Sequence, residues 1–374
     1  MRTFRVGVVG AGTIGVQHID ALRRVPGVQV YAVCDANAQR AEEVRAQWDI
    51  PVACDNWKDL IEDPQVEAVH DCTPNALHDA VNRAAILAGK HIYSEKPLST
   101  SAAEALALWR LAVEHGVAHG VNHQYRLNAA VQDMRARVAS GDAGRVFMVR
   151  GHYLQESNAI PAPGIWRTGA LGGVSYALAD VGIHWMDTAC CVLGKRVEAV
   201  CADLQTVHES RTDASGATEA ARLEDLASVL VRFEDGTPGV LTASKISLGH
   251  KNDLSLSVDA AHYGMRWDQE SPDRLWIGHR THGNEEIYMC SRLAREEAKP
   301  YISAPAGHTM GWSDALRNAV AAFYASVRSG DYARQPQPYA TFEAGYLGTA
   351  FVEACLKSHK ERRWISLESE KSLE

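Results

Sequence analysis

Three side chains occupy positions suited to acid–base chemistry. Lys96 follows a short apolar segment expected to be a strand, and Pro97 restricts the backbone directly after it. Asp180 and His184 are four residues apart, a spacing that places both on one face of a helix. An ammonium can stabilise a developing alkoxide, and an imidazole can act as a general base near neutral pH. Alternatively, Lys96 is a solvated surface lysine, and Asp180 and His184 are a helix cap and a hydrogen-bonded core histidine.

A glycine cluster near the N-terminus predicts a dinucleotide-binding loop. Gly10, Gly12 and Gly15, with Thr13 and Ile14 between the last two, follow a β-branched segment and open a helical pattern. The first glycine permits a tight turn, the second lets a pyrophosphate approach the backbone, and the third lets helix and strand pack closely. The helix N-terminus adds N–H groups and a partial positive charge. A tight turn that binds nothing is the alternative.

An acidic residue at the end of the second expected strand supports the dinucleotide interpretation. Asp35 lies twenty positions after Gly15 and is suited to accept hydrogen bonds from the adenosine ribose. A carboxylate there repels a 2′-phosphate, so NAD is favoured over NADP as the cofactor. Arg40, one helical turn further on, keeps NADP open as the alternative. Asp35 could also act as a helix cap, which a ribose contact would not exclude.

The first 123 residues alternate between strands and helices. This alternation is typical of a doubly wound parallel sheet, whose ligands bind beyond the carboxyl ends of the strands. Lys96 follows such an end, so it is expected to point toward the cofactor. The predicted strands are 4–9, 28–34, 66–72, 90–94 and 117–122, and the predicted helices are 17–24, 38–48, 75–87 and 102–115.

The pattern changes after Arg126. Successive strands without intervening helices predict an antiparallel sheet. We therefore expect a nucleotide-binding domain over 1–123 and a substrate-binding and oligomerisation domain over 124–374, with the last helix a candidate to pack back onto the first domain. The predicted helices are 129–140, 181–193, 311–329 and 342–359, and the predicted strands are 145–153, 197–207, 227–233, 239–247, 254–259, 264–269 and 273–277.

The composition excludes several classes of protein. The 374 residues are 46% hydrophobic and 22% charged with a net charge of −8, and no basic run suits a nucleic acid. No apolar stretch reaches the ~20 residues of a membrane helix, and no leader pattern precedes the first strand. The eight cysteines lack a CxxC pair, which favours reduced thiols in the cytoplasm and no metal site.

Taken together, the motifs resemble the glucose–fructose oxidoreductase/inositol dehydrogenase/rhizopine-catabolism family (Gfo/Idh/MocA). The resemblance spans nearly the whole chain in the right order, and the Lys96 and His184 motifs are more specific than the glycine loop. The motifs are GAGTIG, Cys72-Thr73-Pro74-Asn75 with His78, Glu95-Lys96-Pro97, and Gly172-Gly173 followed by Asp180-x-Gly182-x-His184.

The resemblance implies a fold and a site. It implies an α/β protein with an N-terminal Rossmann sheet and a C-terminal α+β domain, whose large, mostly antiparallel, open-faced sheet builds homodimers or homotetramers. It implies that Lys96, Asp180 and His184 are catalytic, contact the substrate and meet at the nicotinamide. The residues implied to bind the cofactor are Gly10, Gly12, Thr13, Ile14, Gly15, Asp35, Cys72, Thr73, Pro74, Asn75, His78, Glu95, Lys96 and Gln124.

Three further residues are candidates for substrate contact. Arg126 lies in a segment that matches the family loosely, and Trp166 and Arg167 lie in a loop where relatives often contact substrate. Trp166 could stack on a sugar face and Arg167 could hold a hydroxyl or carboxylate, whereas the alternative for Trp166 is an aromatic that covers a hinge. The family often has a third glycine where this chain has Leu171.

These features predict an NAD-dependent oxidoreductase that acts on a secondary alcohol of a sugar, a sugar derivative or a cyclitol. His184 would take the hydroxyl proton, Lys96 would hydrogen-bond the reacting oxygen, and Asp180 would orient the substrate or the lysine. Two alternatives use the same scaffold. One is a glycoside hydrolase that oxidises its sugar transiently and yields no net NADH, and the other is a non-catalytic sensor of NAD and sugar.

Overall fold

The computed structural model describes residues 3–160, 169–212 and 216–367. The chain divides into two compact units, each built from two segments. Unit 1 comprises Met1–Gln124 and Leu316–Leu347, and unit 2 comprises Tyr125–Ala315 and Gly348–Glu374. No helix among the described residues is both long enough and apolar enough to cross a membrane.

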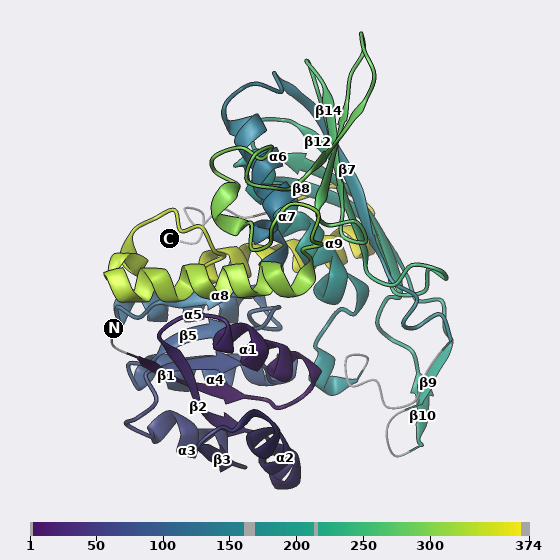
Figure 1. Ribbon diagram of the computed structural model, residues 1–374. Coiled ribbons are helices and arrows are strands. Elements are labelled where there is room, and N and C mark those ends of the chain that lie inside the picture. Colours follow the sequence, from purple (N-terminus) through teal and green to yellow (C-terminus); the bar gives the residue numbers. More distant parts are fainter. Residues whose placement is uncertain (1–2, 161–168, 213–215, 368–374) are drawn as a thin grey trace. The chain divides into compact units, whose positions relative to one another are not determined.

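Unit 1 contains a six-stranded parallel sheet with the strand order β3-β2-β1-β4-β5-β6 (Figure 1). This order confirms the predicted doubly wound Rossmann sheet. The strands are β1 (Phe4–Val9), β2 (Val28–Cys34), β3 (Val52–Cys54), β4 (Ala68–Asp71), β5 (His91–Ser94) and β6 (His119–Val121), and the helices between them are α1 (Thr13–Arg23), α2 (Ala38–Trp48), α3 (Trp57–Glu62), α4 (His78–Leu87) and α5 (Ala102–Glu114).

The direction of strand addition reverses between β1 and β4, which lie next to each other. In an open α/β sheet this reversal opens a crevice beyond the carboxyl ends of the strands, where ligands bind. The loops after β1, β4 and β5 all leave from that edge because the three strands are parallel. They carry the glycine loop, the Cys72–Asn75 segment and Lys96, respectively.

A late segment of the chain completes unit 1. Most of α8 (Trp312–Ser329) and the start of α9 (Phe342–Glu361) belong to it. The Phe323 ring packs edge-on against Tyr93 with centroids 5.3 Å apart, and the Val121 amide donates to the Ala340 carbonyl at 2.8 Å. The chain returning to the first unit is therefore residues 316–347, while the larger part of the 342–359 helix belongs to unit 2.

Unit 2 contains a nine-stranded sheet with the order β16-β15-β14-β13-β7-β12-β11-β8-β17 (Figure 1). Its pairs are antiparallel except for β7 and β12, which run parallel, so the sheet is mostly antiparallel as predicted. The strands are β7 (Val146–Leu154), β8 (Val197–Gln205), β11 (Leu226–Phe233), β12 (Pro238–Ser244), β13 (Asp253–Ala260), β14 (Gly264–Asp268), β15 (Arg274–Gly278), β16 (Glu285–Tyr288) and β17 (Ile365–Ser366), with a separate ribbon of β9 (Ser210–Thr212) and β10 (Thr218–Ala220).

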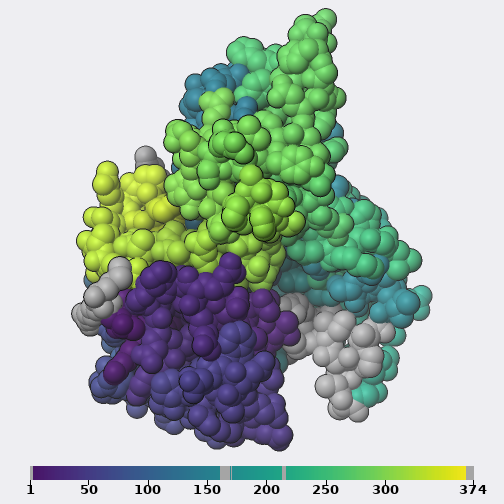
Figure 2. All heavy atoms as spheres, viewed as in Figure 1, coloured from purple at the N-terminus to yellow at the C-terminus, as the bar shows by residue number. Residues whose placement is uncertain are grey.

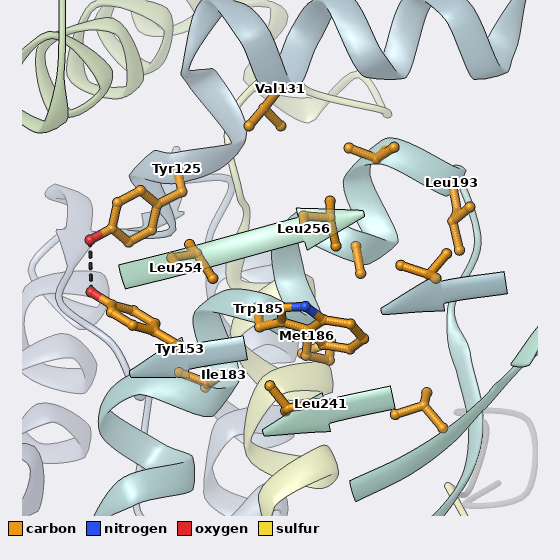
Figure 3. Packing of buried hydrophobic residues seen from close by; sticks show 14 of the residues in the cluster. Tyr125, Val131, Tyr153, Ile183, Trp185, Met186, Leu193, Leu241, Leu254 and Leu256 are labelled. Atoms are coloured by element: carbon orange, nitrogen blue, oxygen red, sulfur yellow. Dashed lines mark hydrogen bonds between the residues drawn. The ribbon is translucent and has the colours of Figure 1, made fainter. Parts of the chain in front are cut away.

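Helices α6 (Ala129–Ala139) and α7 (Ile183–Leu193) and the later part of α9 contribute to the main core of unit 2. Figure 3 shows side chains of α7 beside Leu254 and Leu256 of the sheet. A Cβ added to Gly151 would lie 2.5 Å from Nε1 of Trp185, so the missing side chain lets this indole pack closely onto β7. Burial in β11 alternates strictly, as expected for a sheet with one covered and one open face.

Candidate active site

The glycine loop of unit 1 has the geometry that a dinucleotide requires. Gly10 has φ of +95°, and a Cβ there would lie 2.4 Å from the Cys72 carbonyl oxygen. A Cβ on Gly15 would lie 1.8 Å from the Gly10 carbonyl oxygen, so only glycine lets α1 approach β1 this closely. A Cβ on Gly12, in contrast, would meet no described atom within 4 Å. The space over Gly12, where α1 begins with Thr13 and Ile14, is therefore open to a ligand.

Asp35 is tied to the same loop by hydrogen bonds. One carboxylate oxygen accepts from the Ala11 amide at 2.9 Å and the other from the Asn37 amide at 3.0 Å. Arg40 donates through Nε to the Ala11 carbonyl at 2.9 Å. A carboxylate oxygen has more than one lone pair, so Asp35 can hold the loop and still accept from ribose hydroxyls. The loop and the acidic residue thus form one local cradle.

His78 bridges the two loops that follow β4 and β5. Its Nδ1 lies 2.6 Å from the Pro97 carbonyl oxygen, and its Nε2 lies 2.8 Å from the Thr73 carbonyl oxygen. The buried Asp71 side chain accepts from the amide and hydroxyl of Thr73, and burial raises the pKa of this carboxyl. The predicted cofactor residues of these loops therefore come together within unit 1: Cys72, Thr73, Pro74, Asn75, His78, Glu95 and Lys96.

Lys96 leaves the carboxyl end of β5 beside a buried carboxylate. Glu95 Oε2 accepts a hydrogen bond from the Lys96 amide at 3.2 Å. Its Oε1 accepts a hydrogen bond from the Asn122 side chain at 2.6 Å and lies 3.1 Å from His18 Nε2. Burial by itself would raise the pKa of Glu95, but His18, the charge of Lys96 and Asn122 lower it to about 2. Glu95 is therefore a fixed anion next to Lys96. Gln124, which closes this part of unit 1 after β6, is buried.

Asp180 of unit 2 forms a close ion pair that the sequence did not suggest. It lies in a π-helical turn, η5 (Leu178–Gly182), and its Oδ2 is 2.6 Å from Nζ of Lys245. Lys245 is buried, also donates to the Gln155 side chain, and lies over the Tyr176 ring. A π turn inside a helix often marks a functional site because it reorients the side chains that follow. The partner of Asp180 within unit 2 is thus a second lysine.

His184 follows on α7 and is buried against two tyrosines. Its ring centroid lies 5.0 Å from that of Tyr125 and 6.0 Å from that of Tyr153. The tyrosine hydroxyls are 2.8 Å apart, and each also bonds to Asn252 (Figure 3 shows the tyrosine pair). Burial raises the pKa of Tyr125 to about 12, although bonds to Tyr153 and Asn252 oppose this rise. The His184 imidazole therefore packs against two neutral tyrosines that are hydrogen-bonded to each other.

Of the three other candidates for substrate contact, only Arg126 lies among the described residues. Arg126 makes a bidentate pair with Asp187 of α7, with Nε 3.0 Å from Oδ2; Asp187 is buried and Arg126 is partly buried. Burial would lower the pKa of this guanidinium, but Asp187 raises it, so the guanidinium remains charged. Trp166 and Arg167 lie outside the described residues.

One group of possible metal ligands occurs in the described part of the chain. His279, His282 and Glu285, around the loop between β15 and β16, offer ligand atoms within 4.8 Å of one another. By its colour, this part of the chain belongs to the green protrusion of unit 2 in Figure 2. Because His282 and Glu285 are exposed and Glu285 already hydrogen-bonds His279 at 2.8 Å, the group is explained as a surface hydrogen-bonded cluster.

Comparison with known proteins places the chain in a family. The NAD-binding Rossmann-fold domain of the GFO/IDH/MocA oxidoreductase family matches residues 4–123, and the GFO/IDH/MocA C-terminal domain matches residues 131–263. The chain therefore belongs to the Gfo/Idh/MocA family of oxidoreductases, as the motifs predicted.

Similar proteins include several dehydrogenases. Levoglucosan dehydrogenase of Pseudarthrobacter phenanthrenivorans is 28% identical over 74% of this chain and 76% of its own length. Myo-inositol 2-dehydrogenase of Thermotoga maritima is 28% identical over 64% of this chain and 68% of its own. An inositol dehydrogenase homolog from Azotobacter vinelandii, solved with NAD⁺, superposes with a TM-score of 0.89 at 26% identity, covering 98% of this chain and 97% of its own.

Proposed function

We propose that the chain is an NAD-dependent dehydrogenase that oxidises a secondary alcohol of a sugar, a sugar derivative or a cyclitol. The observation that carries this proposal is the Lys96 site, where an ionised, buried carboxylate fixes the lysine's backbone at the carboxyl end of β5. The family and the dehydrogenase relatives support the same reaction class. The relatives named above include no glycoside hydrolase, so the hydrolytic alternative receives no support.

The glycine loop fits the dinucleotide by shape and by charge. The open space over Gly12 would take the pyrophosphate, and Asp35 would accept from the ribose and repel a 2′-phosphate. The nicotinamide, when bound, supplies the hydride acceptor. The residues after β4 and β5, with Gln124, would line the rest of the cofactor site.

The chain's own residues would handle the proton and the developing charge. His184 accepts the hydroxyl proton, and Lys96 donates a hydrogen bond to the same oxygen and stabilises its negative charge. Asp180 orients the substrate, and its pair with Lys245 at 2.6 Å holds the carboxylate in place. Arg126, through its pair with Asp187, would hold α7, the helix that carries His184.

A panel of polyols tests the proposal directly. Purified protein is incubated with NAD or NADP and with monosaccharides, disaccharides, anhydrosugars, inositols and sugar acids, and NADH formation is followed by absorbance. We expect NADH with at least one polyol and a higher kcat/KM for NAD than for NADP. Absence of reduction with every polyol, in both reaction directions, would contradict the dehydrogenase, and preference for NADP would contradict the role of Asp35.

We also propose that the open face of the unit 2 sheet joins copies of the chain into a homodimer or homotetramer. Leu230 and Phe147 expose 47% and 54% of their surface on this sheet, an arrangement suited to an apolar contact. Light scattering should give the mass of a dimer or tetramer, and Leu230→Lys should lower it. A wild-type protein that remains a monomer at micromolar concentration would contradict this assembly.

A further inference from the structure

A chain of buried hydrogen bonds runs through unit 1 and ends on Glu95. The Tyr324 hydroxyl lies 3.1 Å from His70 Nε2, and His70 Nδ1 lies 2.8 Å from His18 Nδ1. His18 Nε2 then lies 3.1 Å from Glu95 Oε1. Tyr324, His70 and His18 are fully buried, and they come from α8, β4 and α1, elements far apart in the sequence.

The charge of Glu95 sets the direction of this chain. An ionised carboxylate can only accept, so the proton between His18 and Glu95 is on His18 Nε2. When His18 carries only this proton, its Nδ1 accepts from His70 Nδ1, and His70 Nε2 accepts from the Tyr324 hydroxyl. Each of these three contacts then joins one donor to one acceptor. Burial and the neighbouring His18 lower the pKa of His70 well below its usual range, so a second proton on that ring is disfavoured.

The groups around the chain reinforce this arrangement. Asn122 donates to the same Glu95 oxygen at 2.6 Å, and the Tyr93 hydroxyl fixes Asn122 by donating to its oxygen. The His70 ring stacks between Tyr93 and Tyr324, with centroids 5.0 Å and 5.9 Å away. The charged neighbours are Lys96 and Asp71 beside Glu95, and Arg328 and Glu67 beside Tyr324. Burial raises the pKa of Tyr324 well above its usual range, so its hydroxyl retains the proton that it donates.

We propose that Tyr324, His70 and His18 are positioning residues that hold the Glu95 carboxylate in one orientation and, through its bond to the Lys96 amide, set the direction in which Lys96 leaves β5. This inference rests on the proposed function, because Lys96 must act on a substrate for its position to matter. A small displacement of a reacting group costs rate more than it costs substrate binding. Loss of this hydrogen-bond chain should therefore change kcat more than KM.

The first test measures the protons themselves. Protein labelled with nitrogen-15 histidine is studied by long-range nitrogen–proton correlation NMR at pH 8, and His18→Asn and His70→Phe variants assign the two rings. We expect His18 to be protonated on Nε2 only and His70 on Nδ1 only. A His70 ring protonated on Nε2, or a His18 ring carrying both protons, would reverse the chain and overturn the proposal.

The second test compares two tyrosines that lose the same atom. Tyr324→Phe removes the first donor of the chain, whereas Tyr339→Phe removes an equally buried hydroxyl in the same unit that bonds only to Ser326 among the described contacts. We expect Tyr324→Phe to lower kcat about three- to tenfold with KM for NAD and polyol within about twofold. Tyr339→Phe should retain kcat. Equal kcat values in the two variants would overturn the proposal.

A third variant extends the comparison and separates the two proposals. His70→Phe keeps the stacked ring but removes both nitrogens, so it should lower kcat at least as much as Tyr324→Phe. If none of the polyols supports reduction of NAD, the proposed function fails. The protonation pattern of the two histidines then still shows whether the hydrogen-bond chain exists as described. If the pattern is found and kcat does not respond, only the positioning role fails.

Discussion

The two units prepare their candidate residues in different ways. In unit 1, the dinucleotide loop depends on backbone geometry: Gly10 and Gly15 have no room for a side chain, and Asp35 is anchored by backbone amides. In unit 2, Asp180 depends on Lys245, a side chain 65 residues further along the chain. The contacts of the glycine loop are local in sequence, whereas the Asp180–Lys245 pair joins distant parts of the chain. The glycine loop with Asp35 can therefore be recognised from residue spacing, whereas the Asp180–Lys245 pair becomes apparent only in the folded structure.

Lys96 should give the largest effect in either unit. Lys96→Met removes the charge that we propose stabilises the reacting oxygen, and it leaves the glycine loop unchanged. We expect kcat to fall about a thousandfold, with little change in NAD affinity measured by fluorescence titration. Lys90→Met is the matched control, because Lys90 lies at the opposite end of β5 and donates to the Asp63 and Val66 carbonyls. Full turnover by Lys96→Met would remove Lys96 from the chemistry.

A substitution of Lys245 tests the long-range pair that it forms with Asp180 in unit 2. Lys245→Met leaves Asp180 without its buried cation, so kcat/KM for the polyol should fall about a hundredfold and the free energy of unfolding by about 3 kcal/mol. Lys251→Met serves as control, since Lys251 is 71% exposed and pairs with Glu156 at the surface. Unfolding in urea and steady-state kinetics measure the two quantities. Identical behaviour of the two variants would show that the Asp180 pair is dispensable.

The glycine loop offers a contrast within unit 1. Gly12→Val places a side chain in the open space over the loop, so KM for NAD should rise about tenfold or more while the unfolding temperature stays unchanged. Gly15→Ala forces a Cβ against the Gly10 carbonyl, so it should lower the unfolding temperature. Thermal unfolding and NAD kinetics distinguish the two. A destabilised Gly12→Val with normal KM would show that the space over Gly12 is not the binding surface.

The smallest expected effect is a pH dependence of stability in unit 1. Burial lowers the pKa of His119 to about 4, and its Nδ1 accepts the Phe342 amide at 3.1 Å. The unfolded chain binds a proton below about pH 6.5 while the folded chain does not, so the free energy of unfolding falls as pH drops from 6.5 to 4. His119→Asn keeps an acceptor and should reduce this slope by about 1 kcal/mol per pH unit in urea titrations. An unchanged slope would contradict the buried neutral histidine.

Much of unit 1 could be predicted because its signals are local. The strands β1 and β2 have the predicted bounds, and the glycine spacing identified the loop. The short strands β3, β9, β10, β16 and β17 were missed, since two to four residues carry too little periodicity to be recognised. The return of residues 316–347 to unit 1 depends on contacts such as Phe323 with Tyr93, which no local pattern encodes.

The candidate site was predicted in the same uneven way. Lys96 and His184 stand out by motif. Lys245, in contrast, lies between Ser244 and Ile246 in an ordinary strand-like sequence, whose polar–apolar alternation is its only signal. Its neighbour Ser244 is the last residue of β12 and pairs with Leu154, the last residue of β7. Only this pairing shows that Lys245 lies near Gln155, the residue that follows β7. His70 and Tyr324 were missed for the same reason, because an apolar strand and an amphipathic helix each conceal one polar residue among many.

The proposed function requires that Lys96 of unit 1 and His184 of unit 2 act on the same substrate oxygen. A crystal structure of the chain with NADH and the ketone product of its best polyol measures this directly. We expect Lys96 Nζ and a ring nitrogen of His184 both to lie within about 3.2 Å of the product's carbonyl oxygen. A complex in which either side chain is turned away from that oxygen would contradict it.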